Sequence, residues 1–226
     1  MYLILSGGGS GMQVSKSYEK YAEIIDKNKP VLYIPLAWGS RDYDGCLEWL
    51  KGELLPYKID KFKMITNANQ FNNINLNDYN SLFIGGGNTY KLLNYLKQSE
   101  GYRKIEEFIK NGGIVFGGSA GAIIFGKDIQ TCNICSNDEN RWPDLDTSGF
   151  DVINGKSLSC HYGSEGRTKE HDNNSEKYER SGFDIISLTE EQSALVTDEK
   201  VEIIDNSKEN IKKKWKFGNH LVLLFS

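Results

Sequence analysis

The stretch that most constrains the fold is residues 113–122, which read G-I-V-F-G-G-S-A-G-A. The apolar run 114–116 is typical of a strand buried on both faces. Two glycines, Ser119 and further small residues follow, which predicts a strand, a sharp turn and a helix. Gly117 and Gly121 complete G-x-S-x-G, the nucleophile elbow of serine hydrolases, where only small neighbours let strand and helix pack closely. An ordinary tight turn also uses Gly-Ser pairs, but the flanking strand and helix favour the elbow.

Glycine clusters follow two other apolar runs. Residues 2–6 lead into glycines 7–9, and residues 81–84 lead into glycines 85–87. Amphipathic segments at 15–27 and 41–54, and apolar spacings near 92–96 and 105–109, predict helices between the strands. Strands alternating with helices indicate a doubly wound, mostly parallel sheet, whose ligands bind at the carboxyl ends of the strands. All three clusters fall at such ends, which predicts one site there. The alternative is that the glycines only permit close helix packing.

The last third of the chain changes character. Residues 127–149 are polar and irregular, an insertion of the kind that often covers a site, and 164–180 read as loop plus a solvated helix. The pattern predicts short strands at 152–159, 184–188, 193–197, 201–205, 211–217 and 220–225. No linker divides the chain, so we expect one domain over residues 1–226. The expected fold class is α/β, a three-layer doubly wound sheet with flanking helices and a C-terminal set of short strands.

Composition excludes several functions. The net charge of −4 provides no electrostatic reason to expect nucleic acid. No apolar run approaches the roughly 20 residues that span a bilayer, so no membrane partner is expected. The first residues lack a charged n-region and read as a strand instead of a signal peptide. Four cysteines fit a reducing cytosol, which predicts a cytoplasmic protein.

Two short motifs suggest cofactors but do not complete a cofactor site. Glycines 7 and 9 begin G-x-G-x-x-G, but Met12 stands at the third position, so a tight turn at the edge of the site is expected. Cys132 and Cys135 form C-x-x-C, and a zinc site would need two more ligands, for which only Cys160 and His161 lie nearby in sequence. Free thiols in a loop are the preferred interpretation. We expect no metal ion and no cofactor.

A seryl nucleophile needs a base within hydrogen-bond reach. His220 falls in a predicted final strand, and His171 lies in the charged run K-E-H-D. His161 stands where a strand runs into a Gly-containing loop, from which a side chain can reach the site. We therefore predict His161 as the base.

The orienting acid and the oxyanion donors follow from the same geometry. Residues 190–195 read E-E-Q-S-A-L and put a carboxylate in a turn between two strands, while Asp138 and Asp144 are rivals in the insertion. The residue after the nucleophile, Ala120, is one expected backbone donor. The second is Gly86 or Gly87, and we choose Gly87.

The motif order resembles the dipeptidase E family of serine peptidases, which includes the α-aspartyl dipeptidases and, more distantly, the cyanophycinases. The blocks G-G-G-N-T at 85–89 and G-S-A-G-A at 118–122 carry most of this resemblance, with His161 and E-Q-S-A-L at 191–195 following. It implies a class I glutamine amidotransferase-like fold and the triad order Ser119, His161, Glu191. Some descriptions of the family point to Asp138 as the third member. Ile123, where aspartyl dipeptidases tend to carry asparagine, and the residues before His161 depart from the family pattern.

The resemblance also implies a small peptide substrate, with N-terminal aspartate as the specific expectation. A buried carboxylate needs a cation, best an arginine. Arg167, six residues after His161, is the candidate, Arg141 is the second, and Asn88 is expected to contact substrate. The alternatives are a cyanophycinase-like or esterase hydrolase using the same site, or a non-catalytic binding module of the same fold.

Overall fold

The computed structural model describes residues 1–40 and 43–207. Its strands are β1 (Tyr2–Ser6), β2 (Val31–Ile34), β3 (Phe62–Met64), β4 (Ser81–Ile84), β5 (Ile114–Gly118), β6 (Ser157–Ser159), β7 (Ile185–Ser187), β8 (Gln192–Thr197) and β9 (Val201–Asp205). Its α-helices are α1 (Ser15–Ile24), α2 (Asp44–Leu54), α3 (Thr89–Lys97), α4 (Gly101–Lys110), α5 (Ala120–Ile123) and α6 (Thr168–Arg180). Among the described residues, no helix has both the length and the apolar character needed to cross a membrane.

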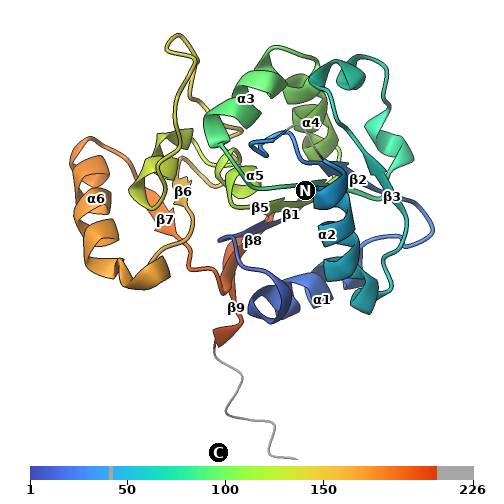
Figure 1. Cartoon of the computed structure of the whole chain (residues 1–226), viewed down its shortest axis with the longest axis horizontal. Helices are drawn as coiled ribbons and strands as arrows, with labels where there is room; N and C mark the ends of the chain where they lie inside the picture. The colour runs from blue at the N-terminus through green and yellow to red at the C-terminus, as the bar shows by residue number, and fades with distance from the viewer. Residues whose placement is uncertain (41–42, 208–226) are drawn as a thin grey trace, which may run out of the picture.

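Seven strands form one mixed sheet in the order β3-β2-β4-β5-β1-β8-β9 (Figure 1). The first five strands in this order are parallel, β8 is antiparallel to β1, and β9 is antiparallel to β8. In the parallel part the chain crosses over through helices, as the alternation of motifs predicts. The expected mostly parallel, doubly wound sheet is therefore confirmed, with β8 and β9 as its short C-terminal strands.

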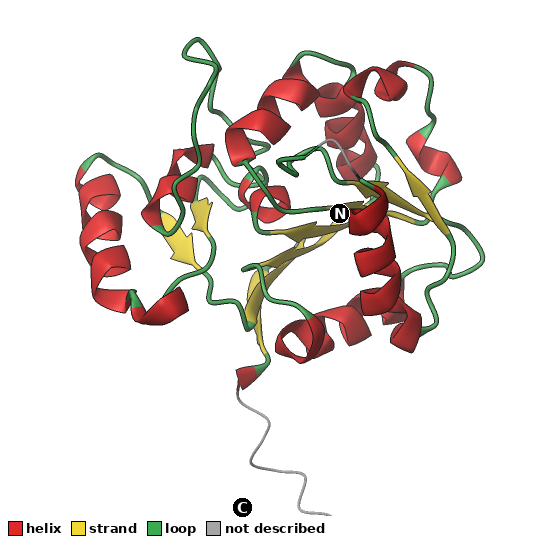
Figure 2. Ribbon diagram, viewed as in Figure 1, coloured by secondary structure: helices red, strands yellow, loops and turns green. Residues whose placement is uncertain are grey.

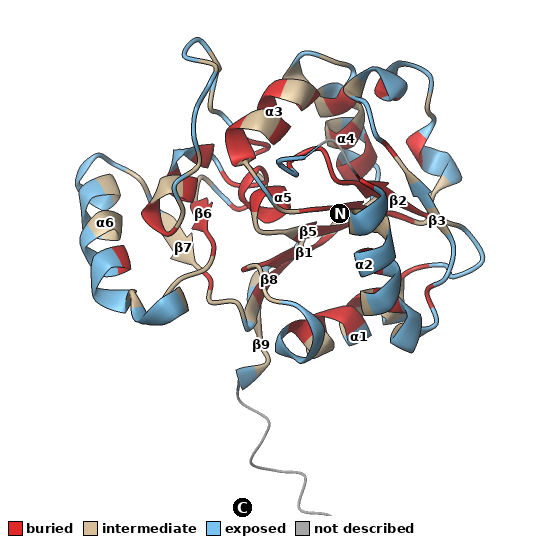
Figure 3. Cartoon of the chain, viewed as in Figure 1, coloured by how far each residue is buried: buried red, intermediate tan, exposed pale blue. Residues whose placement is uncertain are grey.

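Helices cover both faces of the sheet (Figure 2). Because successive strand residues point to opposite faces, Ile34 and Ile84 pack with α3, α4 and α5. Tyr33 and Phe83, one position earlier on the same strands, pack instead with α1 and α2. Figure 3 shows the buried residues concentrated along the sheet and on the helix faces toward it. A hydrophobic core therefore packs on each face of the sheet, and the carboxyl ends of its parallel strands lie between the two cores.

The segment after α5 adds a smaller unit at one end of the sheet. Strands β6 and β7 pair in parallel as a separate two-stranded sheet, with α6 beside them (Figure 1). The expected strands at 152–159 and 184–188 are thus shorter than predicted, because only three residues of each find a partner. The solvated helix expected within 164–180 is α6. The strands expected at 211–217 and 220–225 lie outside the described residues, as does His220.

Candidate active site

The G-x-S-x-G stretch folds as a strained strand–turn–helix. Ser119 has φ 51° and ψ −114°, a conformation that side chains other than glycine rarely adopt. A Cβ added at Gly117 would lie 2.2 Å from the Gly121 carbonyl oxygen, and one at Gly121 would lie 2.1 Å from that of Ile84. Both glycines are therefore required, because β5, α5 and β4 approach too closely for any side chain. This is the geometry of a nucleophile elbow.

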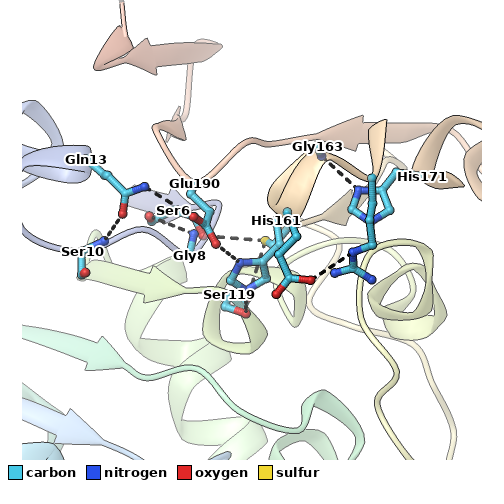
Figure 4. Close-up of polar contacts among 12 residues, drawn as sticks. Ser6, Gly8, Ser10, Gln13, Ser119, His161, Gly163, His171 and Glu190 are labelled. Carbon is cyan, nitrogen blue, oxygen red and sulfur yellow. Dashed lines mark hydrogen bonds and ion pairs between the residues drawn. The ribbon is translucent and has the colours of Figure 1, made fainter. Parts of the chain in front are cut away.

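The Ser119 hydroxyl points at His161 (Figure 4). Ser119 Oγ lies 2.9 Å from His161 Nε2. The backbone N–H of His161 donates to Gly7 O at 2.9 Å, and His161 itself has φ 63°, in the left-handed region. The loop after β6 thus delivers the imidazole to the nucleophile, so that the chosen histidine and serine lie within hydrogen-bond reach.

The carboxylate that contacts the imidazole belongs to Glu190, which lies 3.0 Å from His161 Nδ1 through Oε1. The choice of Glu191 is corrected: its side chain is exposed, and its carbonyl oxygen accepts from Asn206 beside β9. Glu190 and Glu191 occupy the centre of a turn closed by Gln192 N–H donating to Thr189 O. Their side chains leave that turn in different directions, so only one of the two can reach His161.

A second contact holds the other oxygen of the Glu190 carboxylate. Gln13 Nε2 lies 3.4 Å from Glu190 Oε2, and Gln13 Oε1 accepts from the Ser10 backbone N–H (Figure 4). Gln13 was not predicted from the sequence. Its only local signal is its place three residues after Ser10, in a capping box that opens the 3₁₀ turn Gly11–Val14.

The glycine loop after β1 lies directly against the histidine and the glutamate. A Cβ at Gly8 would meet His161 Cε1 at 2.2 Å, and one at Gly9 would meet the Glu190 carbonyl oxygen at 2.2 Å. Gly8 also has φ +116°. The expected tight turn at the edge of the site is therefore present, and its lack of side chains lets the imidazole and its carboxylate sit beside β1.

Unused backbone donors surround Ser119. Within the described residues, no hydrogen bond is donated by the backbone N–H of Gly86, Gly87 or Ala120. A Cβ at Gly86 would lie 3.2 Å from Ser119 Cβ, and one at Gly87 would lie 2.3 Å from the Ala37 carbonyl oxygen. The loop after β4 thus approaches the nucleophile with bare backbone, as an oxyanion hole requires.

Two other predicted residues, Asn88 and Asp138, are engaged elsewhere. Asn88 caps α3: its Oδ1 accepts from Lys91 N–H and its Nδ2 donates to Glu139 O. Asp138 accepts from the N–H of Thr89, the first residue of α3, at 2.7 Å, so its carboxylate binds a helix start and not the imidazole. Both side chains hold the insertion against α3.

The two candidate arginines pair with neighbouring glutamates. Arg167 Nε lies 3.4 Å from Glu165 Oε2 at the start of α6. Arg141 Nη2 lies 2.6 Å from Glu139 Oε2, with both side chains exposed. Neither arginine belongs to the lining of the cavity beside Ser119.

The cysteines are free thiols. Cys132, Cys135 and Cys160 are buried, and burial raises the pKa of each thiol above its ordinary value. Cys132 lies in the 3₁₀ turn Ile129–Ile134, which packs into the core where a loop was expected. Among the residues with described positions, no cluster of His, Cys, Asp and Glu could hold a metal ion.

Comparison with known proteins identifies the family. The model of peptidase family S51 matches residues 2–204. The chain belongs to peptidase family S51. Membership confirms the resemblance drawn from the motifs.

Two groups of proteins resemble this S51 chain. Peptidase E of Shewanella denitrificans is 30% identical over 127 residues, 55% of this chain and 52% of the relative. Peptidase E of Shigella flexneri serotype 5b is 26% identical over 142 residues, 59% and 54% respectively. The chain thus matches about half the length of these curated relatives. A structure of a candidate Peptidase E from Listeria monocytogenes EGD-e superposes with TM-score 0.73 at 18% identity, covering 90% of this chain and 98% of that one. A peptidase from an acI-B1 Actinobacterium has TM-score 0.62, also at 18% identity, covering 90% and 87%. These two structures share the fold.

Proposed function

We propose that this chain hydrolyses short peptides as a serine peptidase with the triad Ser119, His161 and Glu190. The observation that carries the proposal is the pair of contacts on one imidazole, 2.9 Å to Ser119 Oγ and 3.0 Å to Glu190 Oε1. A carboxylate only accepts hydrogen bonds, so His161 Nδ1 carries the proton and Nε2 is left to accept from the serine. Residues 1–226 act as one peptidase domain in this proposal.

The reaction follows from these positions. Ser119 Oγ attacks the scissile carbonyl carbon while His161 Nε2 takes its proton, and the imidazolium is stabilised by Glu190. The backbone N–H groups of Gly87 and Ala120 are proposed to stabilise the oxyanion, with Gly86 beside them. His161 then returns the proton to the departing amine, and water hydrolyses the acyl-enzyme by the same path in reverse. Every group that this scheme uses is supplied by the chain itself.

The resemblance to the dipeptidase E family also predicts a substrate with an N-terminal aspartate, bound by Arg167. A carboxylate removed from water needs a cation beside it. Of the described residues that line the cavity at Ser119, none is Lys or Arg, and Arg167 pairs with Glu165. The geometry therefore supports peptide hydrolysis better than it supports a preference for aspartate.

Labelling by a phosphonofluoridate, followed by peptide mapping, tests the nucleophile. We expect modification at Ser119 and loss of labelling in Ser119→Ala. The variants Ser119→Ala and His161→Ala should each lose several orders of magnitude in turnover, and the double variant should be little worse, because triad members act as a unit. His171→Ala should keep most activity. An unlabelled Ser119 beside a control hydrolase that reacts would favour the binding-module alternative.

A further inference from the structure

A cavity of about 640 Å³ opens at Ser119 and His161. It runs from the glycine loops at the carboxyl edge of the sheet toward the layer formed by α1 and α2. Six aromatic side chains line it: Tyr18, Tyr33, Trp38, Trp49, Phe83 and Phe116. We call these residues the aromatic lining.

The floor of the cavity is a set of rings packed on one another. Phe83 and Phe116, neighbours on β4 and β5, stack with centroids 4.8 Å apart and an interplanar angle of 7°. The Tyr18 ring lies 5.2 Å from Phe116, and the Tyr33 ring lies edge-on to Phe83 at 5.8 Å. These distances are those of favourable aromatic pairs. The floor is therefore preformed, and a further ring can pack on it without ordering loose side chains.

The rim carries indoles that water covers only in part. Trp38 is 49% exposed and Trp49 is 44% exposed, and the Trp49 ring is edge-on to Phe83 at 6.5 Å. Large apolar side chains exposed beside a reactive group mark a surface that binds apolar material. Burying them under a ligand removes apolar area from water.

The described part of the lining offers no carboxylate, ammonium or guanidinium group as partner for a charged group. Among the described lining residues there is no Asp, Glu, Lys or Arg. A carboxylate or ammonium placed on this floor would lose its hydration without gaining an ion pair from these lining residues. An apolar ring of the substrate has no charge, so its burial on this floor carries no such loss of hydration.

We propose that the aromatic lining is the specificity site of the peptidase and binds a large apolar side chain, above all an aromatic one, next to the scissile bond. This inference rests on the proposed function, because Ser119 must attack the bond that the cavity presents to it. It replaces the aspartyl preference by a preference for residues such as Phe.

Gly45 provides a way to test the size of the site. It lies in the first turn of α2 and lines the cavity, and a Cβ added there meets nothing within 4 Å. A leucine at this position would extend into the open space and narrow the entrance. Gly52 lies further along α2. A Cβ added there also meets nothing within 4 Å, but Gly52 does not line the cavity. Gly52→Leu is the matched control, since both changes replace a glycine of α2 by a better helix former.

The experiment measures kcat/KM for the dipeptides Phe-Ala, Ala-Phe, Asp-Ala, Lys-Ala and Ala-Ala. We expect Phe-Ala or Ala-Phe to be cleaved best, by about 10- to 100-fold over Ala-Ala, the value of burying one benzyl side chain. In Gly45→Leu this ratio should collapse toward one, and in Gly52→Leu it should stay as in the wild type. Fastest cleavage of Asp-Ala or Lys-Ala would overturn the inference, as would an unchanged ratio in Gly45→Leu.

The two proposals fail in different ways. If no dipeptide is cleaved and the phosphonofluoridate does not label Ser119, the proposed hydrolysis fails. If Ser119 is labelled and Ala-Ala is cleaved as fast as the Phe dipeptides, hydrolysis stands and the aromatic specificity site is refuted. Labelled Ser119 with cleavage of the Phe dipeptides above all others supports both.

Discussion

Gly8→Ala tests whether the glycine loop after β1 positions the base. The new methyl carbon would lie 2.2 Å from His161 Cε1, whereas ordinary van der Waals contact begins at 3.4 Å. The imidazole must therefore move by roughly 1 Å, a misplacement that costs about 100-fold in rate when a catalytic group is involved. We expect kcat/KM to fall by about that factor.

The same substitution also strains the backbone. Gly8 has φ +116°, which an alanine adopts at a cost of about 1–3 kcal/mol. For a chain of this size each kcal/mol lowers Tm by about 2–4 °C. Loss of stability and loss of activity must therefore be separated by a control variant. That variant should strain the backbone at a positive φ without placing a new methyl group against His161.

Gly11→Ala is that control. Gly11 lies in the same loop with φ +53°, and a Cβ there meets nothing within 4 Å. Both variants should lower Tm in thermal unfolding, but only Gly8→Ala should lose activity against a dipeptide well below Tm. If Gly8→Ala keeps the kcat/KM of Gly11→Ala, the contact between this loop and the base does not matter for catalysis, and the reasoning is refuted.

Two further predictions concern single side chains. Glu190→Gln should lower kcat by roughly 100-fold or more because the imidazolium loses its counter-charge, whereas Glu191→Gln should change kcat little. Steady-state kinetics on the two variants test this prediction, and equal losses of kcat would contradict the choice of Glu190. His171 is buried, and burial together with Arg167 lowers its pKa below the ordinary value. As the pH falls, His171 is therefore protonated in the unfolded chain before it is protonated in the native chain. The free energy of unfolding should fall as pH drops below about 6.5. His171→Asn, measured by thermal unfolding from about pH 5 to 8, should flatten that dependence, and an unchanged slope would exclude His171 as its source.

The elbow and the histidine that contacts Ser119 could be predicted because their signals are local. G-x-S-x-G is a contiguous spacing, and the close approaches at Gly117 and Gly121 are its direct consequence. His161 follows a strand and stands two residues before Gly163, a position at a strand end from which its side chain can reach the site. The alternation of strands and helices likewise predicted the sheet, because the side-chain period of each element is a property of the chain itself.

The choice between Glu190 and Glu191 required the tertiary structure. Both stand in one turn, and what separates them is which side chain lies against the loop after β1. Asn88 was equally undecidable, because the same amide can contact a substrate or cap a helix, and here it caps α3.

The aromatic floor also depends on tertiary structure. Tyr33, Phe83 and Phe116 belong to three strands far apart in sequence, and they become neighbours only because Tyr33 pairs in register with Phe83 and Phe83 with Phe116. A one-residue shift of any strand would move its aromatic side chain to the opposite face. The sequence by itself therefore determined the elbow, the choice of His161 beside it and the sheet, which follow from short spacings. Only the packing of distant segments decided which carboxylate contacts His161 and the character of the cavity.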